Sequence, residues 1–342
     1  MRALAAANRA LAELKGRAAT IPNQGILIDT LALQEAKASS EIENIVTTQD
    51  ELFQMDLFPD GLESGAAKEV ARYRDALKLG LTQLLDTGGL IRNATLIEMY
   101  RFLKARSDGF RATPGTALKN DRTGEVIYVP PQDRNEIIAA MSSLEAFIND
   151  DEICQLDPLI KMALIHHQFE SIHPFADGNG RIGRILNVLY LTRTGLLDIP
   201  ILYLSCHINR HKAEYYRLLQ AVREEGNWEA WVLYMLEAVE KTSRTTLALV
   251  EGIRKQMADV KQRMRTHLPK LYSQDLLNNL FRHPYTRIQF VRDDLSVTRQ
   301  TAADYLEQLV EKGFLEKHKS GRSNYYINTA LVALFLQVSE GP

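Results

Sequence analysis

The sequence contains little cysteine, with two residues, Cys154 and Cys206, among 342. Each lies among apolar residues and neither belongs to a C-x-x-C pair, so a disulfide, a redox motif or a nucleophilic thiol is not expected. Two small buried side chains in a reducing compartment are the simpler interpretation.

Long hydrophobic runs are also missing. The longest, residues 199–204 and 331–336, fall far short of the roughly 18 to 20 apolar residues that span a bilayer. Charged residues interrupt the alanine-rich first twenty residues, which therefore lack the apolar segment of a secretory signal. We expect a cytoplasmic protein that has no membrane partner.

Neither sign of charge prevails, because 41 Lys and Arg face 43 Asp and Glu, for a net charge of -2. Such a chain has no overall field of the kind that marks nucleic-acid or membrane binders, so any anion site must be local. With 45% hydrophobic and 25% charged residues, the composition is that of a globular protein and excludes a disordered chain. The length predicts two or three domains.

Helical spacing of apolar residues dominates the chain and predicts a mainly α fold. The helical segments are 26–45, 66–85, 94–105, 135–148, 158–172, 181–189 and 228–268, the last as one helix or two. One strand pattern precedes residue 270 and ends before Pro130; it consists of Glu125, Val126, Ile127, Tyr128 and Val129. We expect a β-hairpin flap at about 123–131 on the helical body.

A different pattern follows Pro269. Three short helices and two strands, at 314–318 and 324–327, are typical of a winged helix-turn-helix-like α+β module over 269–342. We expect this module to have a small core of its own, so that a chain ending near 268 keeps the active part. Its nine Lys and Arg against eight Asp and Glu leave DNA contact, protein docking and dimerisation all open.

The run from His173 to Arg184 contains most of the candidate chemistry. Its G-x-G-x-x-G spacing does not predict a dinucleotide fold, because no strand precedes it and no acidic residue follows at the usual distance. No Gly-Lys-Ser/Thr follows either, which excludes a P-loop. Since Pro174 ends one helix and Arg181 begins the next, the loop between them predicts a cradle of backbone N–H groups for an anion.

Side chains around this cradle suit a polyphosphate. Arg181 and Arg184 are three residues apart, on one face of a helix. Asp177 supplies an oxygen ligand of the kind that Mg²⁺ prefers. His173 is a candidate base that is neutral near pH 7. Phe175 is expected to be a core anchor of the loop.

This run resembles the signature of the Fic (Fic/DOC) family, His-x-Phe-x-Asp/Glu-Gly-Asn-Gly-Arg-x-x-Arg, at every constrained position. The resemblance extends over most of residues 20–245. It implies a Fic-like helical core with a β-hairpin flap, and transfer of AMP from ATP to a Ser, Thr or Tyr hydroxyl of a target protein or of the enzyme itself. It also implies His173 as the base, Asp177 as the Mg²⁺ ligand, and the flap as a docking edge for the target.

The resemblance further implies a set of residues for ATP. These are Gly178, Asn179, Gly180, Arg181, Ile182, Gly183 and Arg184 around the phosphates, with Tyr215 and Tyr216 near the adenine. For the two tyrosines, a role as core aromatic residues is an equally good interpretation.

A second element, from Ser39 to Asn44, resembles the inhibitory motif Ser/Thr-x-x-x-Glu-Gly/Asn of the family class with an N-terminal inhibitory helix. Ser39 and Glu43 are four residues apart, on one helical face. The resemblance implies that an inhibitory helix, at about 26–46, places Glu43 against Arg184 as a two-point fork and keeps this arginine from the γ-phosphate.

The expected organisation has four parts. They are an N-terminal helical region at 1–110, a catalytic core at 111–245, a connecting helix at 246–268 and the winged-helix-like module at 269–342. The alternative function is a DNA-binding regulator whose core only senses a nucleotide. The intact base favours the enzyme, because a sensor needs no base. A homodimer is a further open possibility.

Overall fold

A computed structural model describes residues 1–58, 64–119, 123–320 and 323–340. The fold is mainly helical, as predicted, with fifteen helices and two small antiparallel sheets in these residues. In the N-terminal region the helices are α1 (Arg2–Ala18), α2 (Gly25–Ile42), α3 (Gln49–Leu57), α4 (Gly65–Asp86) and α5 (Asn93–Lys104). The following helices are α6 (Arg134–Asn149), α7 (Pro158–Ile172), α8 (Asn179–Arg193), α9 (Leu204–Arg210), α10 (Lys212–Glu225) and α11 (Trp228–His267).

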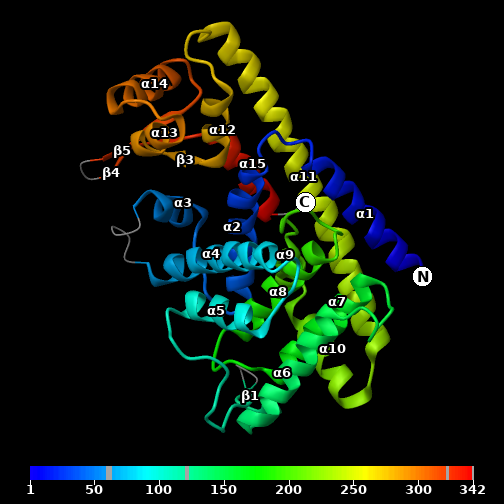
Figure 1. The fold of residues 1–342 in the computed structure, drawn as a ribbon. Helices are drawn as coiled ribbons and strands as arrows, with labels where there is room; N and C mark the ends of the chain where they lie inside the picture. Colours follow the sequence, from blue (N-terminus) through cyan, green and yellow to red (C-terminus); the bar gives the residue numbers. More distant parts are fainter. Residues whose placement is uncertain (59–63, 120–122, 321–322, 341–342) are drawn as a thin grey trace.

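Helix α2 runs through the middle of the molecule, between the C-terminal module and the helices around α8 (Figure 1). It contacts α4, α8, α9 and α12 (Gln274–Arg282). Most of its residues are buried, including the polar Glu35, Ser39 and Ser40. Helix α2 is thus buried on nearly all sides and contacts both the core helices and the C-terminal module.

Helices α2 and α8 differ from their expected bounds by more than one residue, and the segment 228–268, expected as one helix or two, is a single helix. Helix α2 ends at Ile42, so Glu43 lies in the turn that closes it, and Asn44 takes a left-handed φ of 60°. Helix α8 starts at Asn179 instead of Arg181, because Gly178 supplies the left-handed N-cap. Helix α11 is one helix of 40 residues, about 60 Å long at 1.5 Å per residue.

The flap is a two-stranded antiparallel hairpin of β1 (Leu118–Lys119) and β2 (Val126–Tyr128). The sequence predicted only the second strand. The first has two residues, too short for an alternating pattern, and pairing with β2 creates it. The hairpin therefore starts before the range 123–131 that was expected.

The C-terminal module has the predicted helices and hairpin, with two elements that the sequence analysis missed. Its elements are α12 (Gln274–Arg282), β3 (Tyr285–Thr286), α13 (Ile288–Leu295), α14 (Arg299–Glu311), β4 (Glu316–Ser320), β5 (Ser323–Ile327) and α15 (Thr329–Glu340). The strand order is β3-β5-β4. The missed elements are β3 and α15, and α15 packs back on α11.

The expectation of a separate core for this module is wrong. One continuous cluster of buried side chains extends from α1 to Phe335 in α15. Phe53 in α3 contacts the rings of Tyr285 and Phe335, with centroids 5.1 Å and 6.1 Å apart. Because these aromatic residues come from both regions, the module and the N-terminal region share their packing.

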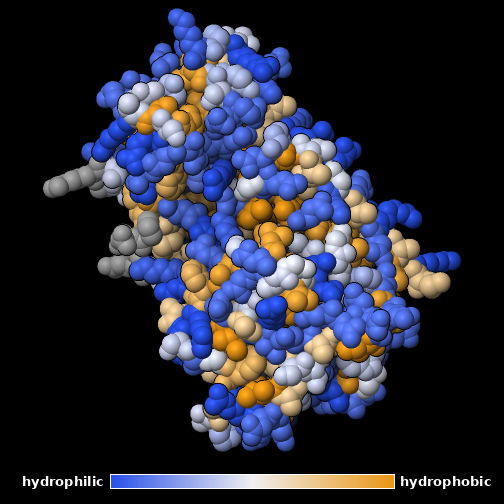
Figure 2. Space-filling view, in the orientation of Figure 1, coloured by the Kyte–Doolittle hydropathy of each residue, from blue (hydrophilic) through white to orange (hydrophobic). Residues whose placement is uncertain are grey.

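On the face that Figure 2 shows, hydrophobic residues lie in small groups among hydrophilic ones. No helix in the described ranges combines the length and the apolarity that a membrane crossing requires. Cys154 and Cys206 are both free thiols. Of the two cysteines, Cys206 is buried as expected, but Cys154 is only half-buried.

Candidate active site

Two side chains, Asn179 and Phe175, hold the loop after α7 in place through hydrogen bonds and packing. Asn179 accepts a hydrogen bond from the Phe175 N–H through Oδ1 and donates one to the Phe175 carbonyl through Nδ2, both at 2.8 Å. Phe175 is fully buried and stacks on Tyr100 with ring centroids 4.2 Å apart, which confirms its expected role as a core anchor. The amide of Asn179 thus shapes the loop from within.

Helix α8 packs very closely on α7. A Cβ added at Gly183 would lie 2.9 Å from Glu170 Oε1 and 3.1 Å from Phe169 Cδ1, so a larger residue would require both side chains to shift. Ile182 is fully buried in the core. These two residues therefore set the position of the helix, and they do not line the cavity described next.

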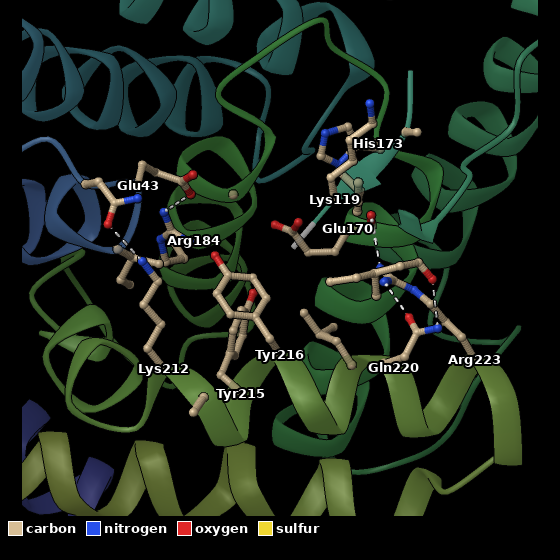
Figure 3. Close-up of a pocket in the computed structure, with 18 residues that line it drawn as sticks. Glu43, Lys119, Glu170, His173, Arg184, Lys212, Tyr215, Tyr216, Gln220 and Arg223 are labelled. Atoms are coloured by element: carbon tan, nitrogen blue, oxygen red, sulfur yellow. Dashed lines mark hydrogen bonds and ion pairs between the residues drawn. The ribbon is translucent and has the colours of Figure 1, made fainter. Parts of the chain in front are cut away.

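A cavity of about 770 Å³ lies beside the loop (Figure 3). Six of the residues that the sequence analysis singled out as site residues line it together with the flap residue Ile127: Glu43, His173, Gly180, Arg184, Tyr215 and Tyr216. The other predicted phosphate residues Gly178, Asn179 and Arg181, and the predicted metal ligand Asp177, are not among the residues that line it. Polar residues that the sequence analysis missed also line it: Lys119, Glu170, Lys212, Gln220 and Arg223.

Arg184 is fully buried and held by the end of α2. Its Nε donates to Ser39 Oγ at 2.7 Å, and its Nη2 donates to the Ser39 carbonyl at 2.9 Å and to Glu43 Oε1 at 2.8 Å. The contact with Glu43 uses one oxygen and one nitrogen, so the expected two-point fork is wrong. Burial acts to lower the pKa of Arg184, but Glu43 more than offsets it and the pKa is raised.

The Glu43 carboxylate lies against Gly180, at the start of α8. A Cβ added at Gly180 would collide with Glu43 Oε1 and would lie 2.9 Å from Arg184 Nη1. The carboxylate is therefore in contact with the glycine that opens the predicted anion cradle. An anion cannot take this place until Glu43 leaves it.

Arg181 contacts α4, whereas Arg184 contacts α2. The Nη1 of Arg181 donates to Glu69 Oε1 in α4 at 2.6 Å, and only 2% of the Arg181 side chain is exposed. Lys104 Nζ lies 2.7 Å from Glu69 Oε1 and 2.6 Å from Asp177 Oδ2. Burial raises the pKa of Glu69, but hydrogen bonds from Lys104 and Arg181 lower it more.

His173 closes α7 in the left-handed region, with φ 50° and ψ 58°. As expected from proline at the next position, His173 leaves the right-handed helical region and α7 ends at Ile172. Arg111 holds this conformation, since its Nε donates to the His173 carbonyl at 2.8 Å and its backbone N–H donates to the Pro174 carbonyl at 2.8 Å. Burial, followed by the charge of Arg111, lowers the pKa of His173 to about 4, so the imidazole is neutral at pH 7.

The two tyrosines of α10 differ. Tyr215 is buried, and its hydroxyl lies 2.8 Å from His166 Nε2 inside the core. Tyr216 is 44% exposed and borders the cavity (Figure 3). Of the pair, Tyr216 is the ring available to stack on a ligand.

Glu170 is a buried carboxyl group that points into the cavity (Figure 3). Its Oε1 has no hydrogen-bond partner among the described residues. Burial raises its pKa to about 7. The cavity thus contains one carboxylate paired with Arg184 and one carboxyl group whose pKa is raised by burial.

A metal site made of protein ligands alone is not present among the described residues, where no three His, Cys, Asp or Glu side chains gather. Asp177 offers one carboxylate: Oδ1 accepts the Gly178 N–H at 2.6 Å, Oδ2 faces Lys104, and 57% of the side chain is exposed. One accessible carboxylate fits Mg²⁺ when phosphates and water complete the coordination.

Three protein-family models match the chain. They are the Fic/DOC family N-terminal model at residues 1–82, the Fic/DOC family model at 90–191, and the model of the C-terminal domain of SoFic-like protein adenylyltransferases at 256–331. The second match includes the loop and the flap. The third begins inside α11, in agreement with a module that shares this helix with the core.

Curated relatives carry the name protein adenylyltransferase Fic. The chain is 26% identical to the Culex quinquefasciatus protein over 183 residues, which are 54% of this chain and 34% of that protein. It is 30% identical to the Drosophila erecta protein over 115 residues, which are 34% of this chain and 22% of that protein. The chain therefore spans about a third or less of the length of these relatives.

Solved structures share the fold. A Fic family protein from Desulfovibrio desulfuricans G20 matches with a TM-score of 0.58 and 18% identity over 96% of both chains. Fic-1 from C. elegans matches with a TM-score of 0.56 and 20% identity over 74% of this chain and 73% of that one. With the N-terminal region, the motif-bearing loop and the C-terminal module each matched by a family model, the chain belongs to the Fic/DOC family.

Proposed function

We propose that this protein is a protein adenylyltransferase, which transfers AMP from ATP to a Ser, Thr or Tyr hydroxyl of a target protein and of itself. One observation carries the proposal: the neutral imidazole of His173, the loop glycine Gly180 and the guanidinium of Arg184 all border one cavity beneath the flap. A base, an anion cradle and a phosphate-binding cation are what such a transfer requires.

In the proposed step, the hydroxyl oxygen of the target attacks the α-phosphorus of ATP. A new oxygen–phosphorus bond forms, the bond from the α-phosphorus to the oxygen that bridges to the β-phosphate breaks, and pyrophosphate leaves. The hydroxyl proton moves to the imidazole of His173. The loop N–H groups, Arg181 and Arg184 stabilise the negative charge of the transferred and leaving groups.

Asp177 is the residue that would hold Mg²⁺, which shields phosphate charge when it is bound. Tyr216 is the candidate stacking surface for adenine, since its ring borders the cavity and is partly exposed. Tyr215 supports it from the core, with ring centroids 5.1 Å apart.

The target is proposed to dock along the flap. Val126, Ile127 and Val129 are 49%, 42% and 56% exposed, which leaves an apolar strand at the surface. Tyr128 anchors the strand, because its hydroxyl donates to the Ser171 carbonyl at 3.0 Å. Strand addition at such an edge aligns a target segment by main-chain hydrogen bonds.

The proposed regulation is autoinhibition by the end of α2. Glu43 lies against Gly180 and bonds Arg184, which Ser39 also holds. ATP that enters while Glu43 is in place meets a carboxylate where a phosphate belongs. Displacement of the triphosphate by about 1 Å can reduce the rate roughly 10²-fold.

Incubation with ATP labelled on either the α- or the γ-phosphate tests the function. We expect label to reach protein from the α-position alone, and His173→Ala to reduce this transfer by about 10² to 10⁴-fold. ATP affinity, measured by calorimetry, is expected to stay near that of the parent, because the base acts on the hydroxyl. Transfer of the γ-label, or undiminished labelling by His173→Ala, would contradict the proposal.

A further inference from the structure

Four charged side chains form a chain of contacts that links α8 and the loop before it to α4 and α5. Arg181 contacts Glu69, Glu69 contacts Lys104, and Lys104 contacts Asp177, at 2.6, 2.7 and 2.6 Å. Two of the four, Arg181 and Asp177, belong to the signature loop. The other two come from α4 and α5, and no motif marks them.

Glu69 differs from Glu43 in how it is held. Glu43 lies in the turn after a helix and its carboxylate bonds one cation, Arg184, so a small backbone movement releases it. Glu69 lies inside a helix of 22 residues, and its Oε1 accepts from both Lys104 and Arg181. A carboxylate fixed in a helix and shared by two cations is not free to leave, so it is suited to hold a cation in place.

The contact leaves part of Arg181 available. Nη1 bonds Glu69, whereas Nη2 lies 3.6 Å from the point where a Cβ of Gly178 would be, next to the loop backbone. The guanidinium is thus tethered at Nη1, and its Nη2 lies next to Gly178. An arginine that is oriented before its ligand arrives loses less conformational entropy when the ligand binds.

We propose that Glu69 is a positioning residue of the nucleotide site: supported by Lys104, it holds Arg181 beside Gly178 so that the guanidinium is set for a phosphate of ATP. The inference rests on the proposed function, which supplies ATP as the ligand. Glu69 has no part in the proposed proton transfer and acts through Arg181.

The test measures ligand affinity by calorimetry on the full chain, in EDTA and without a target. Glu69→Gln removes the charge but keeps the size of the side chain. We expect ATP affinity to fall roughly tenfold, because Arg181 loses the charged partner that orients it before the ligand binds. Adenosine, which has no phosphate, is expected to bind the variant and the parent equally.

Asp75→Asn is the matched control, because Asp75 lies on the same helix and pairs with Arg74, outside the cavity. We expect it to change neither affinity. Glu69→Asp, which retains the charge, is expected to weaken ATP binding less than Glu69→Gln, and it remains informative if Glu69→Gln does not fold. In an Arg181→Ala background, Glu69→Gln is expected to have no further effect.

Unchanged ATP binding by Glu69→Gln overturns the inference. Tighter ATP binding overturns it as well, because Glu69 would then hinder ATP binding and not support it. An equal loss of adenosine and ATP overturns it too, because that indicates general damage to the fold. None of these measurements requires AMP transfer. Failure of the proposed function in the labelling assay is therefore distinguishable from failure of this inference.

Discussion

The two ends of helix α2 are held in different ways. At its C-terminal end, Ser39 and Glu43 bond the fully buried Arg184 beside the cavity. At its N-terminal end, Asp29 pairs with Arg282 of the module at 2.5 Å, where 43% of the arginine side chain is exposed. Aromatic packing of Phe53 on Tyr285 adds to the module side.

The difference shows that the contact of Glu43 with Arg184 can be exchanged for another, whereas the contacts with the module anchor helix α2. The buried arginine would be left without a counter-charge if Glu43 moved away, unless an anion replaced the carboxylate. A half-exposed pair such as Asp29–Arg282 contributes little by itself, about 1 kcal/mol at most, so the apolar contacts beside it must carry the attachment. One helix thus has a replaceable contact at one end and a fixed one at the other.

Removal of the module is expected to have the largest effect. A chain ending at His267 loses Tyr285 and Phe335, which cover Phe53. Because a large buried aromatic residue contributes about 3 to 5 kcal/mol, the shortened chain is expected to lose roughly 5 kcal/mol or more of unfolding free energy. Thermal unfolding followed by circular dichroism measures the change. An unchanged melting temperature would show that the fixed end of α2 does not depend on the module.

Glu43→Gly tests the replaceable end. Without the carboxylate, Arg184 and the space over Gly180 are free for the triphosphate, so we expect labelling from α-labelled ATP to be about 10²-fold faster than in the parent. Glu41→Gly is the control, because Glu41 lies two residues earlier and bonds Lys37 and Asn209 instead. The comparison fails if Glu43→Gly is no faster, or if Arg184→Ala is as active as the parent.

The middle of α2 contains a third acidic residue, and its effect is expected to be the smallest. Glu35 is fully buried, and its Oε2 accepts from the Ser205 N–H at 2.9 Å. Burial raises its pKa from 4.5 to about 7, so the folded chain keeps this proton more tightly than the unfolded chain. The stability that the neutral form provides is therefore complete below about pH 4.5 and is lost as the pH rises through about 7.

Glu35→Gln has no such titration. The stability advantage of the parent over this variant is expected to shrink between pH 5 and pH 8, by at most about 3 kcal/mol. Chemical unfolding at several pH values measures it. A difference that is constant over this range would mean that Glu35 is ionised in the folded protein at all of them.

The helices predicted from apolar periodicity all form, but α1, α3, α9 and α10 were not among the predicted segments. Helix α7 matches its predicted bounds, and α4, α5 and α6 differ by one residue at each end. Two other misses depend on contacts or local turns: β1 exists only through pairing with β2, and the turn at Glu43 and Asn44 interrupts a pattern that continues as far as Ile45. The shared core of the module depends on contacts between Phe53 and Tyr285, which lie far apart in the sequence.

The residues of the candidate site also divide into those that the sequence predicted and those that it could not predict. The motif located His173, Gly180 and Arg184, which the fold brings to one cavity. It could not indicate Glu69, which contacts Arg181 from 112 residues away. Nor could it separate residues that face the cavity from those that shape the loop, such as Asn179, because that distinction depends on which way each side chain turns.

The left-handed backbone at His173 has a consequence for which amino acids can occupy this position. A residue with a Cβ costs about 1 kcal/mol or more in that region, and glycine does not. A library of all twenty residues at position 173, sorted for thermal stability alone, would therefore enrich glycine. The same library sorted for AMP transfer would retain histidine. Selection for stability and selection for activity therefore favour different residues at position 173.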